Sequence, residues 1–255
     1  MSSQFAQIEC LAAAPSADEL ADEWDALAPI RRRQIRDGAD ISYHSVVTPT
    51  VLDLLPESST HILDVGCGTG DLSNRLCRYA DRVTGIDISG ESIRLATADF
   101  GSRDNITFLQ RSIAEYAQAS NNPHDVVVAN MVMMDVADLS SFVRDTRSVM
   151  QNGGKFIFSV THPCFWPAYS GYATAPWFDY SLELFVRAPF AISTRSTNCF
   201  STHAHRPLEM YFESFARERL TLEQLREPMP NAAAQARYPT KWSVPRYLVG
   251  SLVAP

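Results

Sequence analysis

The sequence predicts an α/β protein in which a mostly parallel sheet carries helices on both faces. Between residues 61 and 161, short apolar segments alternate with amphipathic ones, as expected for strands followed by helices. Segment 125–130 is apolar throughout its centre, which is typical of a strand covered on both sides. A glycine-rich turn follows the first strand. With 255 residues, the chain can bury a core that needs no disulfide or metal for stability.

Residues 1–58 are predicted to form a helical cap in front of the sheet. Ser16 and Glu19 have the spacing of a capping box, and the apolar positions that follow share one helical face. Pro29 is expected to interrupt this helix. Thr48 followed by Pro49 predicts an N-cap, because proline is favoured at the first helical position.

The core of the sheet is assigned to residues 59–161. Strands are expected at residues 61–65, 82–87, 106–110, 125–130 and 155–161. Helices are expected between them at 70–80, 89–100 and 139–150, the second with Ser89 as its N-cap. Residues 207–255 are predicted to complete the sheet with a helix at 208–218 and strands at 220–227 and 245–253.

Residues 162–206 break this alternation and are predicted to be a loop-rich insertion after the fifth strand. The segment contains ten aromatic residues, and four prolines argue against one long helix. Such an insertion is typical of a lid or pocket wall. It could equally be a subdomain that packs a small core of its own, and both interpretations can hold together.

The segment ILDVGCGTGDLS, Ile62 to Ser73, contains the candidate ligand site. Glycines at 66, 68 and 70 follow a strand that ends in Asp64. In an open parallel sheet, ligands bind beyond the carboxyl ends of the strands, where glycine lets the backbone approach closely. Asp87 ends the second strand, where a carboxylate can accept both hydroxyls of a ribose. A tight turn, with Asp87 stabilising a helix N-terminus, is the purely structural alternative.

The charge of this segment favours a cationic ligand over a dinucleotide. Dinucleotide sites prefer G-x-G-x-x-G, whereas this chain has G-x-G-x-G with Asp71 in place of the last small residue. An acid there would repel a pyrophosphate. Asp64 and Asp71 instead suit S-adenosylmethionine, which carries an ammonium and a sulfonium group.

At this point the sequence resembles the class I S-adenosylmethionine-dependent methyltransferases. ILDVGCGTG is similar to their first motif, GIDIS to the second-strand motif, SIAEY to the adenine loop and DVVVANMVM to the fourth-strand motif. The resemblance covers residues 40–161 and, more loosely, the end of the chain. It implies a Rossmann-like, seven-stranded sheet with an antiparallel last hairpin, and methyl transfer as the activity.

The resemblance also implies roles for individual residues. Asp64, Gly66, Cys67, Gly68 and Gly70 would hold the methionine part of S-adenosylmethionine, and Asp87 its ribose. Around these, Ile88, Ser112 and Ile113 would lie by the adenine, Asn130 and Met131 under the methionine, and Tyr43 in a segment that closes over the cofactor. Many members have an acid where this chain has Ser112, so the adenine contact differs here.

The acceptor is expected to be a small molecule with an aromatic or apolar body. In-line methyl transfer mainly needs alignment, and a base is needed when the acceptor enters as a hydroxyl. His162, held extended before Pro163 at the carboxyl edge of the fifth strand, is the candidate base, or else it only caps the strand. Residues expected to line the acceptor pocket are His162, Trp166, Tyr169, Tyr172, His203 and His205.

Several alternatives stay open at this stage. Oxygen is the favoured methyl acceptor, but nitrogen and carbon fit the same fold. A nicotinamide-dependent oxidoreductase and a non-catalytic S-adenosylmethionine binder are the rival classes. No metal site is expected, because Asp135, five positions beyond Asn130, does not match a magnesium arrangement.

Composition limits the partners and the compartment. A net charge of -7 argues against nucleic acid and anionic membranes as partners. Five scattered cysteines without a CxxC pair suit a reducing cytoplasm, and neither a signal peptide nor a membrane span is expected. The oligomeric state is left open.

Overall fold

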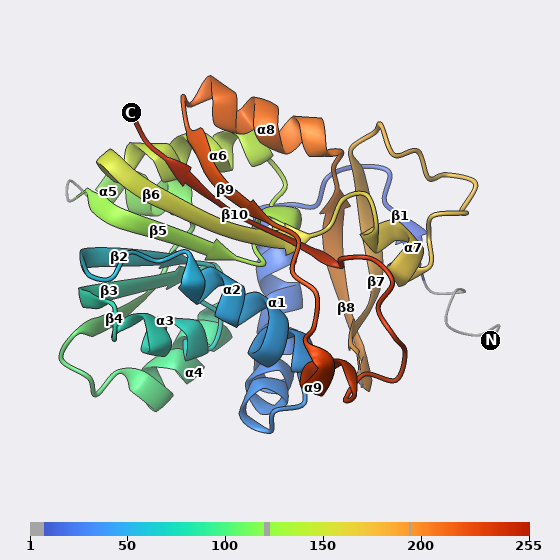
Figure 1. Cartoon of the computed structure of the whole chain (residues 1–255), viewed down its shortest axis with the longest axis horizontal. Coiled ribbons are helices and arrows are strands. Elements are labelled where there is room, and N and C mark those ends of the chain that lie inside the picture. Colours follow the sequence, from blue (N-terminus) through green and yellow to red (C-terminus); the bar gives the residue numbers. More distant parts are fainter. Residues whose placement is uncertain (1–7, 120–122, 194) are drawn as a thin grey trace.

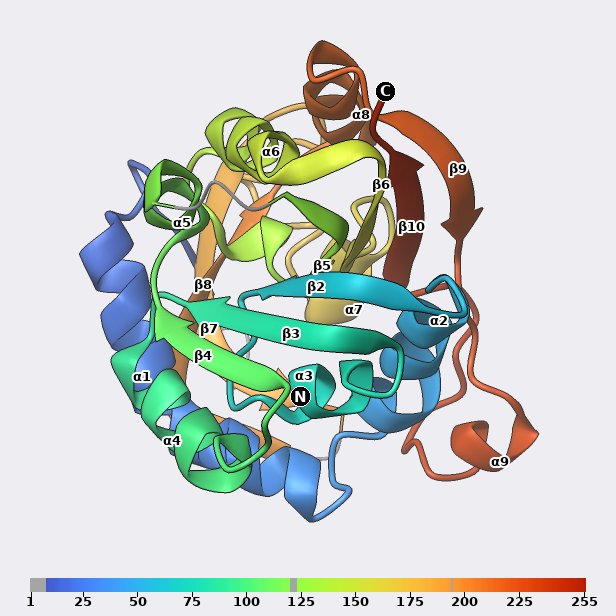
Figure 2. The same ribbon diagram turned by 90° about the vertical axis from the view of Figure 1, so that its left-hand side faces the viewer.

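A seven-stranded sheet forms the centre of the computed structural model, which describes residues 8–119, 123–193 and 195–255. Residues 1–7, part of the segment in which no leader is expected, lie outside this description. The strand order is β4-β3-β2-β5-β6-β10-β9 (Figure 2). The strands are β2 (Ser59–Val65), β3 (Ala80–Asp87), β4 (Ile106–Gln110), β5 (His124–Asn130), β6 (Met150–Thr161), β9 (Thr221–Arg226) and β10 (Tyr247–Val253).

The pairing of the strands confirms the expected fold class. Strands β2 to β6 pair in parallel, whereas β10 runs antiparallel to both β6 and β9. The order reverses beside β2, whose neighbours are β3 and β5. This reversal opens a crevice at the carboxyl ends of the strands, where α/β sheets bind ligands.

Helices cover both faces of the sheet (Figure 1). One face carries α2 (Thr48–Asp53), α3 (Asp71–Leu76) and α4 (Gly90–Phe100), and the other carries α5 (Ile113–Ala119), α6 (Leu139–Ser148) and α8 (Leu208–Arg217). Because side chains alternate along a strand, Val126 and Val128 enter one core while Val127 and Ala129 enter the other. This double burial explains why the segment 125–130 has no polar residue at its centre.

The N-terminal helices differ from the prediction in two places. Helix α1 (Ala17–Arg36) starts with the expected capping box of Ser16 and Glu19, but it runs through Pro29 without a break. Proline removes one backbone hydrogen bond, yet the neighbouring Leu27 and Ala28 are buried and hold the two halves in line.

Thr48 is not an N-cap, which corrects the second expectation. The chain is already helical before it, through the π-helical segment η2 (Tyr43–Val47), and the Thr48 N–H donates to the Tyr43 carbonyl. Pro49 therefore follows a helical residue instead of starting a new helix.

The insertion is more regular than expected. Its first part contains the short helix α7 (Trp166–Ser170), and its second part is a hairpin of β7 (Leu184–Ile192) and β8 (Arg195–His205). The prediction of a loop-rich segment was therefore wrong for residues 184–192 and 195–205. Strand β1 (Glu9–Cys10) pairs with β7 and completes a three-stranded sheet at the carboxyl ends of the parallel strands (Figure 1). Pro189 is tolerated because the strand pairing shifts register there.

Three further short elements were not predicted. Helix α5 begins after Ser112, whose capping box with Glu115 is visible in the sequence. The 3₁₀ helix η3 (Met133–Asp135) follows β5, and α9 (Ala232–Gln235) lies between β9 and β10. Among the described residues, no helix combines the length and the apolar character needed to cross a membrane.

Candidate active site

A cavity of about 1070 Å³ lies where the carboxyl ends of the central strands face the hairpin. The part lined by residues 64–69, 71, 72, 87, 88, 92, 111–113 and 130–132 is called the sheet half. The part lined by Trp24, Asp135, Trp166, Tyr169, residues 188–193 and 196–198, and His203 is called the hairpin half. Pockets for one small ligand usually measure roughly 300–1000 Å³, so this space suits a nucleoside-sized ligand with a second molecule beside it.

The three glycines of the turn after β2 have different roles. Gly66 has a φ of 65°, and a Cβ there would lie 2.4 Å from Val132 Cγ2. Gly68 has a φ of 53°, and a Cβ there would meet no atom within 4 Å, because the position faces open space. A Cβ at Gly70 would meet Phe108 and Ala96, and Gly70 does not line the cavity. The structure therefore does not place Gly70 at the cavity, although α3 begins there as expected.

Two acids make the sheet half electronegative beside this turn. Asp64 is 1% exposed, and its carboxylate accepts a hydrogen bond of 2.5 Å from the Ser73 hydroxyl. Burial raises the pKa of Asp64 to about 7. Asp71, in the first turn of α3, accepts a hydrogen bond from Thr69, and burial raises its pKa as well. A cationic ligand group would relieve the cost of both buried carboxylates.

Asp87 connects the glycine turn to the next helix. Its two carboxylate oxygens accept hydrogen bonds from the backbone N–H groups of Gly68 and Ser89, both at 2.8 Å. Burial raises the pKa of this carboxyl. The Ser89 hydroxyl donates to Asp25 of α1, so the N-terminal cap supports the position at which a ribose is expected.

The end of β5 supplies the opposite wall of the sheet half. Ser159 donates to the amide oxygen of Asn130 at 2.7 Å, and Met131 has a φ of 61°. Methionine rarely adopts this left-handed conformation, and such strain is common where the chain contacts a ligand. Tyr43 covers the cavity from η2, and no described residue makes a hydrogen bond with its buried hydroxyl.

Most of the residues expected around the cofactor therefore gather on one surface. Those that line the cavity are Tyr43, Asp64, Gly66, Cys67, Gly68, Asp87, Ile88, Ser112, Ile113, Asn130 and Met131. Ser112 lies in the capping box of α5, where its hydroxyl donates to Glu115 at 2.9 Å.

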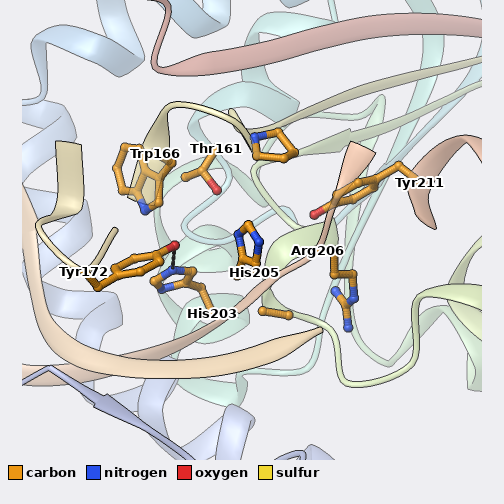
Figure 3. Close-up of a pocket in the computed structure, with 9 residues that line it drawn as sticks. Thr161, Trp166, Tyr172, His203, His205, Arg206 and Tyr211 are labelled. Atoms are coloured by element: carbon orange, nitrogen blue, oxygen red, sulfur yellow. Dashed lines mark hydrogen bonds between the residues drawn. The ribbon is translucent and has the colours of Figure 1, made fainter. Parts of the chain in front are cut away.

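The hairpin half contains three of the residues expected around the acceptor, namely Trp166, Tyr169 and His203. Tyr172 and His205 instead line a second cavity of about 10 Å³ behind His203 (Figure 3). His203 lines both cavities, and its Nε2 atom lies 3.1 Å from the Tyr172 hydroxyl. Burial lowers the pKa of His203 to about 4, so the ring is neutral at neutral pH.

The second cavity is the size of a single water molecule. The indole nitrogen of Trp166 and the hydroxyls of Thr161 and Tyr211 point toward it (Figure 3). In the described part of the chain, the buried Trp166 Nε1 has no hydrogen-bond partner. A water here would supply that partner. His203 and His205 both line the second cavity from β8, but Nε2 of His205 lies 3.1 Å from the carbonyl oxygen of Tyr180.

The structure does not bring His162 to either cavity. Its Nε2 atom pairs with Glu227 at 2.8 Å, and its Nδ1 atom accepts from the N–H of Cys164 at 3.2 Å. Thr161 lines the cavity, and the next side chain of an extended segment points the opposite way. The candidate base of the sequence analysis is therefore a residue that holds the turn after β6, and the histidine that lines the hairpin half is His203.

Arg206 is a functional candidate that the sequence analysis missed. The side chain is fully buried and donates hydrogen bonds to the carbonyls of Met133, Val136 and Ala137 and to Glu183. It thus fixes the segment after β5 against the end of the hairpin. No local pattern marks it, because these carbonyls are about 70 positions away in the chain.

Comparisons with known proteins agree with this architecture. Residues 56–171 match a family described as a methyltransferase domain. A ubiquinone biosynthesis O-methyltransferase of Methylobacterium sp. (strain 4-46) is 35% identical over 128 residues, which cover 50% of each chain. The chain spans about half the length of the curated relatives it matches.

Solved structures resemble this chain over a greater length. The DhpI-SAM-HEP complex has a TM-score of 0.63 at 19% identity and covers 92% of this chain and 95% of the other. The N-methyltransferase NodS from Bradyrhizobium japonicum WM9, in complex with S-adenosyl-L-homocysteine, has a TM-score of 0.56 at 13% identity and covers 82% and 85%. At these identities the likeness concerns the fold. The chain thus has the class I, Rossmann-like fold of S-adenosylmethionine-dependent methyltransferases. More particularly, its residues 56–171 are similar to a methyltransferase domain.

Proposed function

We propose that this protein transfers a methyl group from S-adenosylmethionine to an oxygen of a small aromatic or apolar acceptor. The observation that carries the proposal is one continuous cavity with an acidic glycine turn in one half and an aromatic wall with a neutral histidine in the other. The O-methyltransferase names of the curated relatives support oxygen as the acceptor atom.

The residues of the sheet half fit S-adenosylmethionine. Gly68 leaves open the space that a side chain would fill, and the acids Asp64 and Asp71 favour a cationic amino-acid tail. Asp87 would accept ribose hydroxyls, and the Tyr43 hydroxyl, which makes no hydrogen bond with any described residue, would donate to the ligand. When bound, S-adenosylmethionine supplies a methyl group that its sulfonium already activates.

The same acids disfavour a nicotinamide dinucleotide. Helix N-termini normally attract a pyrophosphate, but Asp71 occupies the first turn of α3 and Asp64 lies buried nearby. Two anionic groups beside a dianionic linker would repel it. An oxidoreductase of the same sheet topology is therefore the weaker alternative.

The hairpin half would align the acceptor and remove its proton. Trp166 and Tyr169 offer flat apolar surfaces that hold an aromatic acceptor and exclude water, and correct alignment contributes about 7–11 kcal/mol. The proton on the acceptor oxygen would become acidic as that oxygen forms its bond to the transferred methyl carbon. His203 would accept this proton. Even with a pKa of about 4, His203 is basic enough to take this proton, because an oxygen that carries three bonds is a much stronger acid than a histidinium ion.

The proposal is tested by assaying S-adenosylhomocysteine release with matched acceptors. A phenol, the corresponding aniline and the corresponding thiol are compared at the same concentration, and the products are identified by mass. We expect methylation of the phenol to exceed that of the aniline, whereas a preference for the aniline would indicate an N-methyltransferase.

Two further outcomes would overturn the proposal. Binding of S-adenosylhomocysteine without turnover of any acceptor would indicate a non-catalytic binder. Calorimetric binding of NAD in place of S-adenosylhomocysteine would indicate an oxidoreductase.

A further inference from the structure

Asp135 is an acid at the hairpin half of the cavity that the proposed methyl transfer does not use. It is the last residue of η3, and its backbone N–H donates to the Val132 carbonyl at 2.7 Å. Asp135 lines the cavity, yet no residue within 8–119, 123–193 or 195–255 makes a hydrogen bond or ion pair with its carboxyl. Asp135 is half-buried, and buried polar groups normally have a partner, so this carboxyl is available to a ligand.

The segment that carries Asp135 is fixed in place from both sides. Arg206 donates to the carbonyl of Met133 at 2.9 Å, before Asp135, and to those of Val136 and Ala137 at 2.6 and 3.1 Å, after it. Because the guanidinium is fully buried and also paired with Glu183, this clamp is rigid. The carboxyl is therefore held ready before any ligand arrives, which lowers the entropic cost of binding.

The charges around Asp135 come from three other elements. Glu23 of α1 and Asp87 of β3 disfavour its ionisation, whereas Arg206 at the end of β8 favours it. Burial has the largest effect and raises the pKa of Asp135 well above its usual range. A carboxyl in this setting both accepts and donates hydrogen bonds, and its ionised form is stabilised when a cation binds.

We propose that Asp135 anchors a hydrogen-bond-donating substituent of the acceptor, a hydroxyl or a protonated amine. This inference rests on the proposed function, because it assigns the acceptor to the hairpin half. Asp135 would then determine specificity: acceptors that carry the second polar group bind tightly, and otherwise identical acceptors without it bind weakly.

The test uses three probes that differ in one substituent, namely phenol, catechol and tyramine. Their affinities are measured by calorimetry with saturating S-adenosylhomocysteine, for the wild-type protein and for Asp135→Ala and Asp135→Asn. We expect Asp135→Ala to weaken the binding of catechol or tyramine about tenfold and that of phenol less than twofold, since one hydrogen bond is lost.

The Asn variant distinguishes the two kinds of substituent. An amide still accepts and donates hydrogen bonds but cannot pair with a cation, so Asp135→Asn should restore catechol binding and leave tyramine binding weak. Asp138→Asn is the matched control: Asp138 is exposed and caps α6 through Ser141, and asparagine is an equally good cap. It should bind all three probes like the wild type.

The outcomes separate this inference from the proposed function. An equal loss of affinity for phenol and catechol in Asp135→Ala, or no loss for either, overturns the anchor even when methyl transfer to phenol proceeds. Failure of the wild type to bind any probe overturns it as well. Failure of the wild type to methylate any acceptor overturns the proposed function itself. Unchanged affinity for S-adenosylhomocysteine confirms that each variant is folded.

Discussion

The hydroxyl oxygen of Tyr172 lies 3.1 Å from Nε2 of His203, although the two residues are 31 positions apart in the chain. Tyr172 follows α7 and His203 belongs to β8, so their contact joins the two segments that enclose the hairpin half. Burial raises the pKa of Tyr172, and the phenol therefore stays protonated. The pair presents an uncharged imidazole whose ring orientation is held by a neighbouring hydroxyl.

Replacement of His203 should reduce catalysis without affecting cofactor binding. In His203→Gln, an acceptor hydroxyl loses the group that takes its proton, and general bases contribute about 10²–10⁴-fold to rates. We expect kcat for a phenolic acceptor to fall at least about 100-fold, with affinity for S-adenosylhomocysteine within twofold of wild type. Tyr172→Phe should lower kcat less and shift the pH dependence of the rate, because the imidazole then loses its hydrogen-bond partner.

His162→Gln is the matched control for this experiment. Both nitrogens of His162 are already engaged, with Glu227 and with the N–H of Cys164. The substitution should lower thermal stability and leave kcat nearly unchanged. If His162→Gln abolished turnover while His203→Gln did not, the assignment of the proton acceptor to β8 would be wrong.

A methyl group at position 68 should weaken cofactor binding more than it weakens the fold. Gly68→Ala introduces a left-handed alanine, which costs about 1–2 kcal/mol, and places its Cβ in the open space of the sheet half. Gly153 has a φ of 72°, and a Cβ there would also meet no atom within 4 Å, but Gly153 does not line the cavity. Gly153→Ala therefore measures the strain alone.

The two alanine variants are compared by urea unfolding and by calorimetry with S-adenosylhomocysteine. Similar losses of stability are expected, with a loss of affinity of at least about tenfold only for Gly68→Ala. Equal affinities for the two variants would show that Gly68 does not border the ligand.

The parts of the fold that the sequence predicted are those with local signals. Alternation of apolar strands and amphipathic helices placed all seven strands of the main sheet. The central strands β2, β5 and β6 enter two cores, which leaves an apolar pattern in the sequence, whereas the edge strand β9 is exposed. Residues at the ends of these strands, such as Asp64, Asp87 and Asn130, meet in space because parallel strands end at one edge. Their gathering at the cavity thus follows from topology alone.

What could not be predicted depends on contacts between distant segments. Strand β1 has only two residues and exists because it pairs with β7. The clamp of Arg206 on the segment around Asp135 joins positions about 70 apart, and nothing near Arg206 in the sequence indicates it. The sequence favours His162 over His203 because a proline defines its backbone, whereas the direction of its side chain depends on Glu227, 65 positions away.

The pH dependence of cofactor binding should report on Asp64. Its pKa of about 7 means that the carboxyl loses its proton near neutrality, and the ionised form attracts the ammonium group of the ligand. Affinity for S-adenosylhomocysteine should therefore rise by up to about tenfold per pH unit from pH 5.5 and level off above pH 7. Asp64→Asn should bind weakly with little pH dependence, and a flat wild-type profile would argue against contact between Asp64 and the ammonium.

Acid should destabilise the fold through His124, at the opposite end of the sheet from the cavity. Burial, His61 and Arg82 lower the pKa of His124 to about 3, and its Nε2 atom lies 3.0 Å from the Tyr116 hydroxyl. The unfolded chain holds a proton on this histidine below about pH 6.5, whereas the folded chain does not until about pH 3. Stability is therefore lost as the pH falls through this window, by up to about 1.4 kcal/mol per pH unit.

His124→Phe removes this titration and should flatten the dependence of the unfolding free energy on pH. The substitution also removes the hydrogen-bond partner of the Tyr116 hydroxyl, so it should lower stability at pH 8. Buried acids with a raised pKa, such as Asp64 and Asp87, act in the opposite direction, because the folded chain binds their protons more tightly. The wild type and His124→Phe both contain these acids, so the difference between their curves of unfolding free energy against pH reports on His124 alone. Urea unfolding from pH 4 to pH 8 measures that difference, and parallel curves would mean that His124 is protonated equally in the folded and unfolded states.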